Sequence, residues 1–327
     1  MIMHENIRGN LICPQDGTRL ESSLSRLRCV QGHEYPMVSG IPVILLDDVE
    51  QTAWWTKKSL EKAWDLAKSG QNGKEGLKNS KIDEHVQQIV ASTCGYLYKP
   101  LIGKLNRYPI PDLRLPKTDK NHLLLDIGCN WGRWSVAAAQ KGYLVVGIDP
   151  SLDALLAAQR VARQMGVEAD FIVADARYLP FRAEFFDVVF SYSVIQHFSK
   201  ENARSAVREA ARVIRPDGTV LIQMPNWLGI RCLYHQAKRG FREGKAFDVR
   251  YWSLAELQRT FSELVGPTEL SVDGYFGLGI QKNDIDLLPL RYRCIVNTSE
   301  FLRHLSERMG WMKHFADSIY VKSRRSG

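Results

Sequence analysis

Residues 123–132 of the chain read LLLDIGCNWG, an apolar run that ends in an acid and a glycine-containing turn. The run predicts a buried strand, and the residues that follow it, Arg133 to Lys141, predict a helix. Gly128 and Gly132 let the backbone approach a ligand closely, and Asn130 tolerates a left-handed conformation better than most residues. The stretch therefore predicts a strand, a ligand-facing turn and a helix in succession.

Short apolar runs alternate with helical patterns from this stretch to residue 224. Strand–helix alternation of this kind predicts an α/β fold with a Rossmann-like, doubly wound and mainly parallel sheet. A final strand is expected over Ala316–Lys322, beside another near Leu270. The other predicted strands are Leu144–Ile148, Ala169–Val173, Phe186–Ser191 and Thr219–Met224, and the helices between them are Asp153–Met165 and Glu201–Ile214.

The turn does not match the known phosphate-binding motifs. A dinucleotide fingerprint G-x-G-x-x-G that starts at Gly128 needs glycine at two positions where Asn130 and Arg133 stand. A P-loop needs Gly-Lys at the positions of Arg133 and Trp134. Binding of a pyrophosphate is therefore disfavoured.

Three acidic residues fall at the carboxyl ends of predicted strands, which is the edge where such sheets bind ligands. They are Asp126, Asp149 and Asp175. A carboxylate accepts hydrogen bonds from both hydroxyls of a ribose, and Asp149 is suited to this role. The pattern favours a ligand that carries a ribose and no phosphate.

Over about residues 120–225 the chain resembles the class I S-adenosylmethionine-dependent methyltransferases. Residues 125–132 resemble the first motif of that family, with Asn130 in place of the usual middle glycine. Each motif alone is weak, but their order and spacing make the combined match specific. The other matching segments are VGID at 146–149, ADA at 174–176 with LPF at 179–181, FDVV at 186–189 and RPDG at 215–218.

The resemblance implies an enzyme that binds S-adenosylmethionine and transfers its methyl group. It implies that Asp149 binds the ribose and that Asp175 and Ala176 contact the adenine. The remaining positions that it places at the cofactor are Asp126, Gly128, Asn130, Gly132 and Ser191.

His197, just past the fourth predicted strand, is the candidate catalytic residue. Acceptors of the family sit in this region. A sulfonium methyl group is already activated, so its transfer depends mainly on an acceptor held close and in line. A base assists when the acceptor is a hydroxyl or a protonated nitrogen. A structural or substrate-orienting role for His197 stays open beside the role of a base.

The N-terminal residues 1–49 predict a small β module that resembles a zinc ribbon. Two residues separate Cys13 from Asp16, three separate Cys29 from His33, and twelve lie between these pairs. Asp16 stands where such ribbons usually have cysteine. A zinc ion bound by these four residues is one interpretation, and a metal-free ribbon held by its apolar core is the other.

The remaining segments complete the predicted organisation. Residues 50–119 are expected to form a helix, a polar linker and a helix over Glu84–Leu105 that covers the cofactor-binding core at 120–226. Residues 227–327 are expected to form the acceptor side, with the basic and aromatic segment Trp227–Trp252 as a lid. For the helix over Glu84–Leu105, the alternative is ordinary core packing. For Trp227–Trp252, the alternative is a solvated amphipathic helix. Tyr275, Phe276 and Asp284 are weaker acceptor-side candidates.

Composition limits the class of protein. The chain has 327 residues, 45% hydrophobic and 24% charged, which is typical of globular proteins. No membrane-length apolar run or secretory signal is apparent, so a cytoplasmic protein is expected. The net charge of +8 permits RNA binding without demanding it. We expect a small-molecule, lipid or glycan-precursor acceptor; an RNA methyltransferase and a non-catalytic, cofactor-binding regulatory protein are the alternatives.

Overall fold

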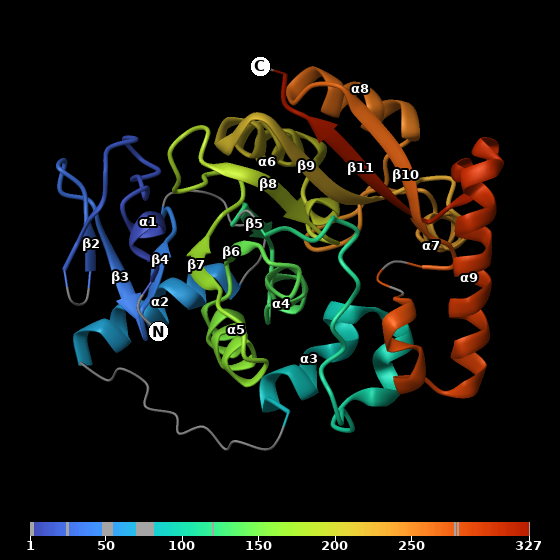
Figure 1. Ribbon diagram of the computed structural model, residues 1–327, viewed down its shortest axis with the longest axis horizontal. Helices are drawn as coiled ribbons and strands as arrows, with labels where there is room; N and C mark the ends of the chain where they lie inside the picture. The colour runs from blue at the N-terminus through green and yellow to red at the C-terminus, as the bar shows by residue number, and fades with distance from the viewer. Residues whose placement is uncertain are drawn as a thin grey trace.

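The computed structural model describes residues 3–23, 26–47, 55–69, 82–119, 121–277, 279 and 281–326. These residues contain an 11-stranded sheet in the order β1-β2-β3-β4-β7-β6-β5-β8-β9-β11-β10 (Figure 1). From β4 to β9 each strand runs parallel to its neighbour, whereas β11 and β10 add an antiparallel end. The predicted Rossmann-like α/β sheet, parallel in its centre, is confirmed.

The central strands lie close to their predicted positions because each is a buried apolar run. The residues of β8, Phe186–Ser191, agree with the predicted range. The antiparallel pair at the end of the chain is also where it was expected. The other strands of this part are β5 (Leu123–Ile127), β6 (Leu144–Asp149), β7 (Asp170–Ala174), β9 (Ile214–Pro225), β10 (Thr268–Gly274) and β11 (Ser318–Arg324).

Helices cover both faces of the sheet, because alternate residues of each buried strand point to opposite faces. Leu123 and Leu125 pack in a cluster with α6 (Lys200–Val213) and α8 (Leu254–Leu264). Leu124 packs in a second cluster with the helices of the other face. These helices are α4 (Arg133–Ala139) and α5 (Leu152–Gln164).

The N-terminal module continues the main sheet. Its strand β4 (Ile41–Ile44) is buried along its whole length and pairs in parallel with β7, Val43 beside Val173 and Ile44 beside Ala174. A helix, α2 (Trp55–Ser69), follows the module. The rest of the module comprises α1 (Glu5–Arg8) and the strands β1 (Glu21–Ser22), β2 (Arg26–Arg28) and β3 (Glu34–Val38).

Two predicted boundaries are wrong. The helix expected over Glu84–Leu105 ends at Cys94, because Gly95 has a φ of 105°, and a 3-10 helix, η1 (Tyr96–Leu101), follows α3 (Glu84–Cys94). The strand predicted over Thr219–Met224 begins earlier, at Ile214: Phe186 pairs with Ile214 and Val188 with Thr219, so the residues between bulge outward. The predicted glycine-containing linker at residues 70–81 lies outside the described residues.

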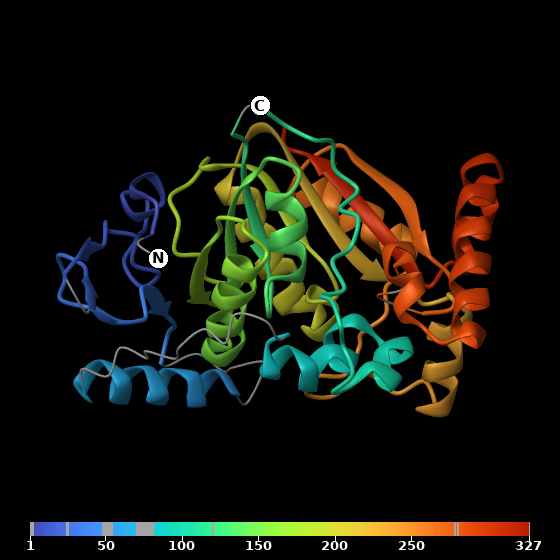
Figure 2. The same ribbon diagram turned by 60° about the horizontal axis from the view of Figure 1, so that its bottom comes forward.

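Among the segments after β9, α9 lies beyond β10 at the end of the sheet (Figure 1). Figure 2 shows α2 and α3 together along the edge of the sheet at which the parallel strands end. No helix in the described part of the chain has the length and apolar character of a membrane span. The remaining helices are α7 (Ile230–Lys238) and α9 (Leu290–Arg308), with 3-10 helices η2 (Ile195–His197), η3 (Lys282–Leu287) and η4 (Gly310–Phe315).

Arg133, at the start of α4, forms a buried ion pair with Asp284 of η3. Its Nη2 atom lies 2.7 Å from Asp284 Oδ2, and its Nε donates to the carbonyl oxygen of Pro109 at 2.8 Å. Tyr98 donates a further hydrogen bond to the same carboxylate. The Arg133 and Asp284 side chains are 4% and 0% exposed. Asp284, a weaker acceptor-side candidate, therefore joins η3 to α4 within the core.

We expect Asp284→Ala to lower the free energy of unfolding by about 3–5 kcal/mol, because it leaves a buried guanidinium without its counter-charge. Urea unfolding followed by circular dichroism measures the change. Asp286→Ala is the matched control, since the Asp286 side chain is 70% exposed and pairs with Arg107 at the surface. Equal losses for the two variants would contradict the structural role of the buried pair.

Candidate functional site

A cavity of about 560 Å³ lies at the carboxyl ends of β5, β6, β7 and β8, the edge where the sequence predicts a ligand. Because the strand order is β7-β6-β5-β8, the cavity extends from the residues after β7 to the residues after β8. Of the cofactor-binding residues predicted from the sequence, those that line the cavity are Gly128, Asn130, Asp149, Asp175 and Ala176.

Asp149, the last residue of β6, presents a buried carboxylate to the cavity. Its Oδ2 accepts a hydrogen bond from the Asn130 amide at 3.0 Å, and its Oδ1 accepts one from the Ser151 amide at 2.9 Å. Each oxygen has two lone pairs, so both keep one acceptor position for a ligand. Asp149 is 7% exposed, and this burial raises the pKa of its carboxyl to about 6. The carboxylate can therefore accept two further hydrogen bonds.

Asn130 adopts the left-handed conformation that the sequence suggested. Its φ is 48°, and its side-chain oxygen accepts a hydrogen bond from the Trp131 amide at 2.9 Å. Asparagine is one of the few residues with a side chain that enters this region at low cost. The residue in place of the usual glycine therefore preserves the backbone shape of the turn.

Backbone conformation and packing within the protein require glycine at position 128. Its φ is 74°, and a Cβ atom at this position would lie 2.2 Å from the Val194 Cγ2 atom. Val194 comes from the segment after β8 and lines the same cavity. The sequence predicted that a ligand lies close to the backbone at Gly128. In the structure, the Val194 side chain occupies that position.

Three predicted cofactor residues lie beneath the cavity wall and do not line it. Asp126 is 1% exposed and accepts a hydrogen bond from the Ser135 hydroxyl at 2.7 Å; burial raises the pKa of its carboxyl to about 7. Ser191 donates to the carbonyl oxygen of Ile127 at 3.0 Å. Gly132 has a φ of 81° at the start of α4, where a Cβ atom would meet Ala158 of α5. In this structure the three residues support the wall from behind.

Asp175 lines the cavity but its carboxylate is already engaged. Arg177 donates to it from Nη2 at 2.6 Å and from Nε at 3.1 Å, and the Arg177 amide donates to Oδ1 at 2.8 Å. The side chains of Arg177 and Asp175 are 5% and 11% exposed. Sequence analysis did not single out Arg177, although its position two residues after the acid could have suggested the pair. Asp175 therefore has less capacity for a new hydrogen bond than Asp149.

His197, in η2, lines the cavity and stacks on Phe247. The two ring centroids lie 3.9 Å apart with an interplanar angle of 6°. His197 Nδ1 lies 2.7 Å from the Phe247 carbonyl oxygen, which can only accept, so Nδ1 carries the proton. His197 Nε2 lies 3.3 Å from the Gln196 amide nitrogen and is left with the lone pair. Burial lowers the pKa of His197 to about 4, so the ring is neutral at physiological pH.

Phe247 connects the predicted lid segment to the cavity. Among the described residues of the segment Trp227–Trp252, Phe247 is the one that lines the cavity. Trp227 itself is 48% exposed, whereas Trp252 is buried. Sequence analysis did not single out Phe247, because nothing local marks which aromatic residue of a long insertion returns to the site.

The predicted covering helix reaches the cavity with its last turn. Ser92, Thr93 and Cys94 of α3 line the cavity, as does Thr56 of α2. Thr93 accepts a hydrogen bond from the Trp131 indole nitrogen at 3.0 Å, which ties α3 to the turn after β5. The end of α3 therefore closes one side of the cavity.

The lining of the cavity is acidic or neutral. Asp149 and Asp175 are its acids, and no lysine or arginine lines it among the described residues. His197 adds no charge because its pKa is low. The cavity is thus suited to neutral or cationic groups and poorly suited to phosphates.

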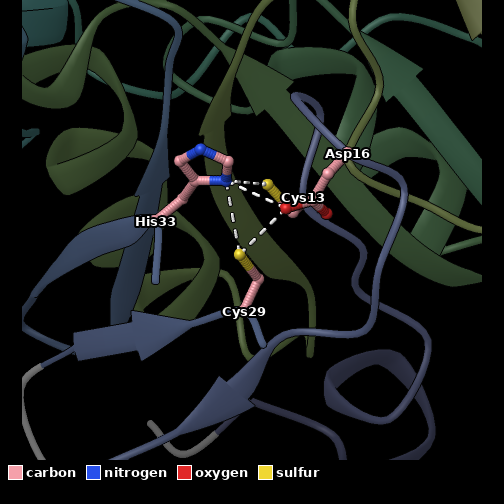
Figure 3. Close-up of side chains that lie close together, drawn as sticks. All are labelled: Cys13, Asp16, Cys29 and His33. Carbon is pink, nitrogen blue, oxygen red and sulfur yellow. Dashed lines mark hydrogen bonds and ion pairs between the residues drawn. The ribbon is translucent and has the colours of Figure 1, made fainter. Parts of the chain in front are cut away.

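A second cluster of polar side chains lies in the N-terminal module (Figure 3). Cys13, Asp16, Cys29 and His33 direct one donor atom each to a common point, and these atoms all lie within 4.8 Å of one another. The structure thus brings together the four residues that the sequence named as metal ligands. Their atoms, two thiols, an imidazole nitrogen and a carboxylate oxygen, belong to the donor types that zinc accepts.

Residues 124–218 match the family model described as a methyltransferase domain. The chain is 33% identical over 147 residues to a ubiquinone biosynthesis O-methyltransferase of Agrobacterium fabrum, which covers 45% of this chain and 55% of the relative. It is 34% identical over 145 residues to a probable tRNA methyltransferase 9B of Homo sapiens. That alignment covers 42% of this chain and 28% of the relative. The crystal structure of the YcgJ protein from Bacillus subtilis aligns with 75% of this chain and 100% of its own, at 22% identity and a TM-score of 0.43. The chain thus spans only part of the curated relatives.

The contact between Gly128 and Val194 yields a stability prediction. Gly128→Ala adds both a strained left-handed residue and a clash, and we expect it to destabilise more than Gly166→Ala, for which the added Cβ meets nothing within 4 Å at a φ of 64°. Left-handed strain alone costs about 1–2 kcal/mol, and overpacking adds about 1–3 kcal/mol. Thermal unfolding measures both. Val194→Gly removes all three carbon atoms that the added Cβ would meet, so the double variant should be more stable than the sum of the two single effects predicts. Additive effects would contradict the assigned clash.

Proposed function

We infer that this chain belongs to the class I S-adenosylmethionine-dependent methyltransferases and propose that it transfers a methyl group to a small-molecule, lipid or glycan-precursor acceptor. The acceptor lies in the part of the cavity after β8, beside His197 and Phe247. The observation that carries the proposal is the lining of the cavity, which has a hydrogen-bonding acid at β6 and no lysine or arginine among the described residues.

The residues of the cavity fit the cofactor. Asp149 has acceptor positions for the two ribose hydroxyls, and its neighbours across the sheet, Asp175 and Ala176, are in place for the adenine. The turn at Gly128 and Asn130 would hold the methionine part. When bound, the cofactor supplies an activated methyl group, so the protein has mainly to hold the acceptor close and aligned.

His197 orients the acceptor. Its Nε2 lone pair is fixed in direction because Nδ1 donates to the Phe247 carbonyl and the ring stacks on Phe247. This lone pair accepts a long hydrogen bond of 3.3 Å from the Gln196 amide, which a hydroxyl of the acceptor would replace. A pKa of about 4 makes the ring a weak base, which favours an accepted hydrogen bond over proton abstraction. Phe247 and Tyr192 add aromatic surface to this part of the cavity. An acceptor with a hydroxyl beside an apolar or planar body matches these groups.

RNA is the less favoured acceptor. The net charge of +8 and the basic segment Trp227–Trp252 would attract a phosphate backbone, and one relative is named as a tRNA methyltransferase. The cavity, however, offers a phosphate no cation among its described residues. A regulatory protein that binds the cofactor without catalysis is the third possibility, and a methyl-transfer assay separates it from the other two.

Asp149→Ala should weaken S-adenosylmethionine binding about 10- to 150-fold, because a buried charge-assisted acceptor is worth about 1.5–3 kcal/mol. Titration calorimetry measures the affinity, with thermal unfolding as the check that the variant is folded. Asp175→Ala should weaken binding less, because the Asp175 carboxylate is already held by Arg177. Wild-type affinity in Asp149→Ala would remove the ribose assignment.

Binding of the cofactor should also depend on pH. The ribose hydroxyls favour the charged form of Asp149, and burial raises the pKa of that carboxyl to about 6. Affinity should therefore fall as the pH drops through 6, about tenfold between pH 7 and pH 5. Asp149→Asn should flatten the profile. A slope that persists in Asp149→Asn would assign the titration to Asp126 instead.

Salt dependence separates the two acceptor classes. A protein that neutralises several RNA phosphates loses affinity steeply as salt rises. We expect only weak, salt-labile RNA binding, and methyl label transferred to an acceptor that is not a nucleic acid. Truncation of Phe247 to alanine should lower turnover of that acceptor. Nanomolar RNA binding at physiological salt, with the label recovered in RNA, would overturn the choice.

A further inference from the structure

In the N-terminal module, one ring nitrogen lies within hydrogen-bond distance of three side chains at once. His33 Nδ1 lies 2.9 Å from Asp16 Oδ2, 3.3 Å from Cys29 Sγ and 3.5 Å from Cys13 Sγ (Figure 3). A ring nitrogen carries one proton or one lone pair and can serve only one of these partners. Cys29 Sγ in turn lies 3.1 Å from the same Asp16 oxygen. A cation at the centre would bind all four atoms at once.

Four of the six distances among the donor atoms are close to those of a zinc site, and all six lie within 4.8 Å. With Zn–S near 2.3 Å and Zn–N or Zn–O near 2.0–2.1 Å, the atoms of a tetrahedral site lie about 3.3–3.8 Å apart. The contacts of His33 and Cys29 given above are within about 0.5 Å of these values. A donor set of two sulfurs, one nitrogen and one oxygen favours zinc over calcium or magnesium, which prefer oxygen ligands.

Neighbouring side chains orient the donor atoms. Asp16 Oδ1 accepts hydrogen bonds from the Thr18 amide at 2.8 Å and the Thr18 hydroxyl at 2.6 Å, which leaves Oδ2 for the centre. The Tyr35 hydroxyl lies 3.2 Å from Cys13 Sγ. Outer contacts of this kind hold metal ligands in position. They leave Asp16 Oδ2 directed to the centre of the cluster, at the position where a zinc ribbon has cysteine.

The cluster is attached to the loop that follows β7. The residue before Cys13, Ile12, donates its amide hydrogen to the carbonyl oxygen of Pro180 at 3.0 Å, and Leu11 bridges to Phe181. Asn10 accepts a hydrogen bond from the Arg182 amide at 3.2 Å. This loop begins with Asp175 and Ala176, which line the cavity. The ligand Cys13 is thus one residue from the contact that fixes the far end of the loop.

We propose that Cys13, Asp16, Cys29 and His33 bind one structural zinc ion, and that this ion holds residues 10–13 against the loop at 175–182 and so supports cofactor binding. The second part rests on the proposed function. Since binding free energies are coupled in both directions, bound cofactor also stabilises the zinc site. Loss of the metal should weaken cofactor affinity about fivefold, at the lower end of such couplings.

The first measurement is metal content. Protein purified without chelator should contain one zinc per chain by elemental analysis, and Cys29→Ala should lose it. Cobalt exchanged into the wild type should give the visible absorption of a tetrahedral site with thiolate ligands. Cys294→Ala is the matched control, because Cys294 is exposed and outside the cluster. Absence of metal from the wild type, with no uptake of added zinc or cobalt, would overturn the proposal.

The role of Asp16 and the coupling need milder variants, because Cys29→Ala could fail to fold. Asp16→Asn should weaken zinc retention against a competing chelator, whereas Asp16→Cys should retain zinc. Calorimetry should then give about fivefold weaker S-adenosylmethionine binding in metal-depleted Asp16→Asn than in Cys294→Ala. Unchanged affinity would overturn the coupling, and equal zinc retention in Asp16→Asn and wild type would overturn the ligand assignment. Zinc-containing wild type that binds no cofactor would instead refute the proposed function.

Discussion

The turn after β5 is held to the end of β6 by three main-chain donors, and the site takes its shape from these hydrogen bonds. The amides of Gly128 and Cys129 both donate to the carbonyl oxygen of Ile148, at 2.7 and 2.9 Å, and the next amide donates to Asp149. The backbone that presents these consecutive donors is left-handed at Gly128 and again at Asn130. The same bonds place the acid in the cavity wall and direct the chain into α4. Cofactor recognition and the start of the helix therefore depend on one backbone conformation.

Sequence analysis could predict what depends on local patterns. Buried runs such as Phe186–Ser191 have few alternatives to a strand once turn residues flank them, and the acid at the end of β6 lies where the parallel sheet requires it. The left-handed Asn130 was predictable because few other residues tolerate that conformation. The four residues of the N-terminal cluster were also found from spacing alone, because metal ligands occur in short pairs on turns.

Features that depend on distant contacts could not be predicted. The short run of β4 is apolar, but nothing in it specifies β7 as its partner. Asp126 occupies the end of a strand as Asp149 does, yet it lies beneath the wall because Ser135 binds its carboxylate. Phe247 reaches the cavity through a long insertion, and stacking on His197 is visible only in three dimensions. The start of β9 could not be predicted for another reason. The sequence RPDG at residues 215–218 is typical of a turn, but the strand includes these residues as a bulge.

The pairing of β4 with β7 also decides how the sheet ends. Without β4, the strand Asp170–Ala174 would carry unpaired amide and carbonyl groups along one side, and open edges of that kind pair with strands of other molecules. The module replaces this buried apolar edge with antiparallel strands, the last of which, β1, has only 2 residues. Arg26 and Arg28 on β2 are exposed beside it. Short, charged edges resist strand addition. The N-terminal module therefore protects the cofactor-binding sheet from self-association, and a chain that starts after β4 would be expected to aggregate.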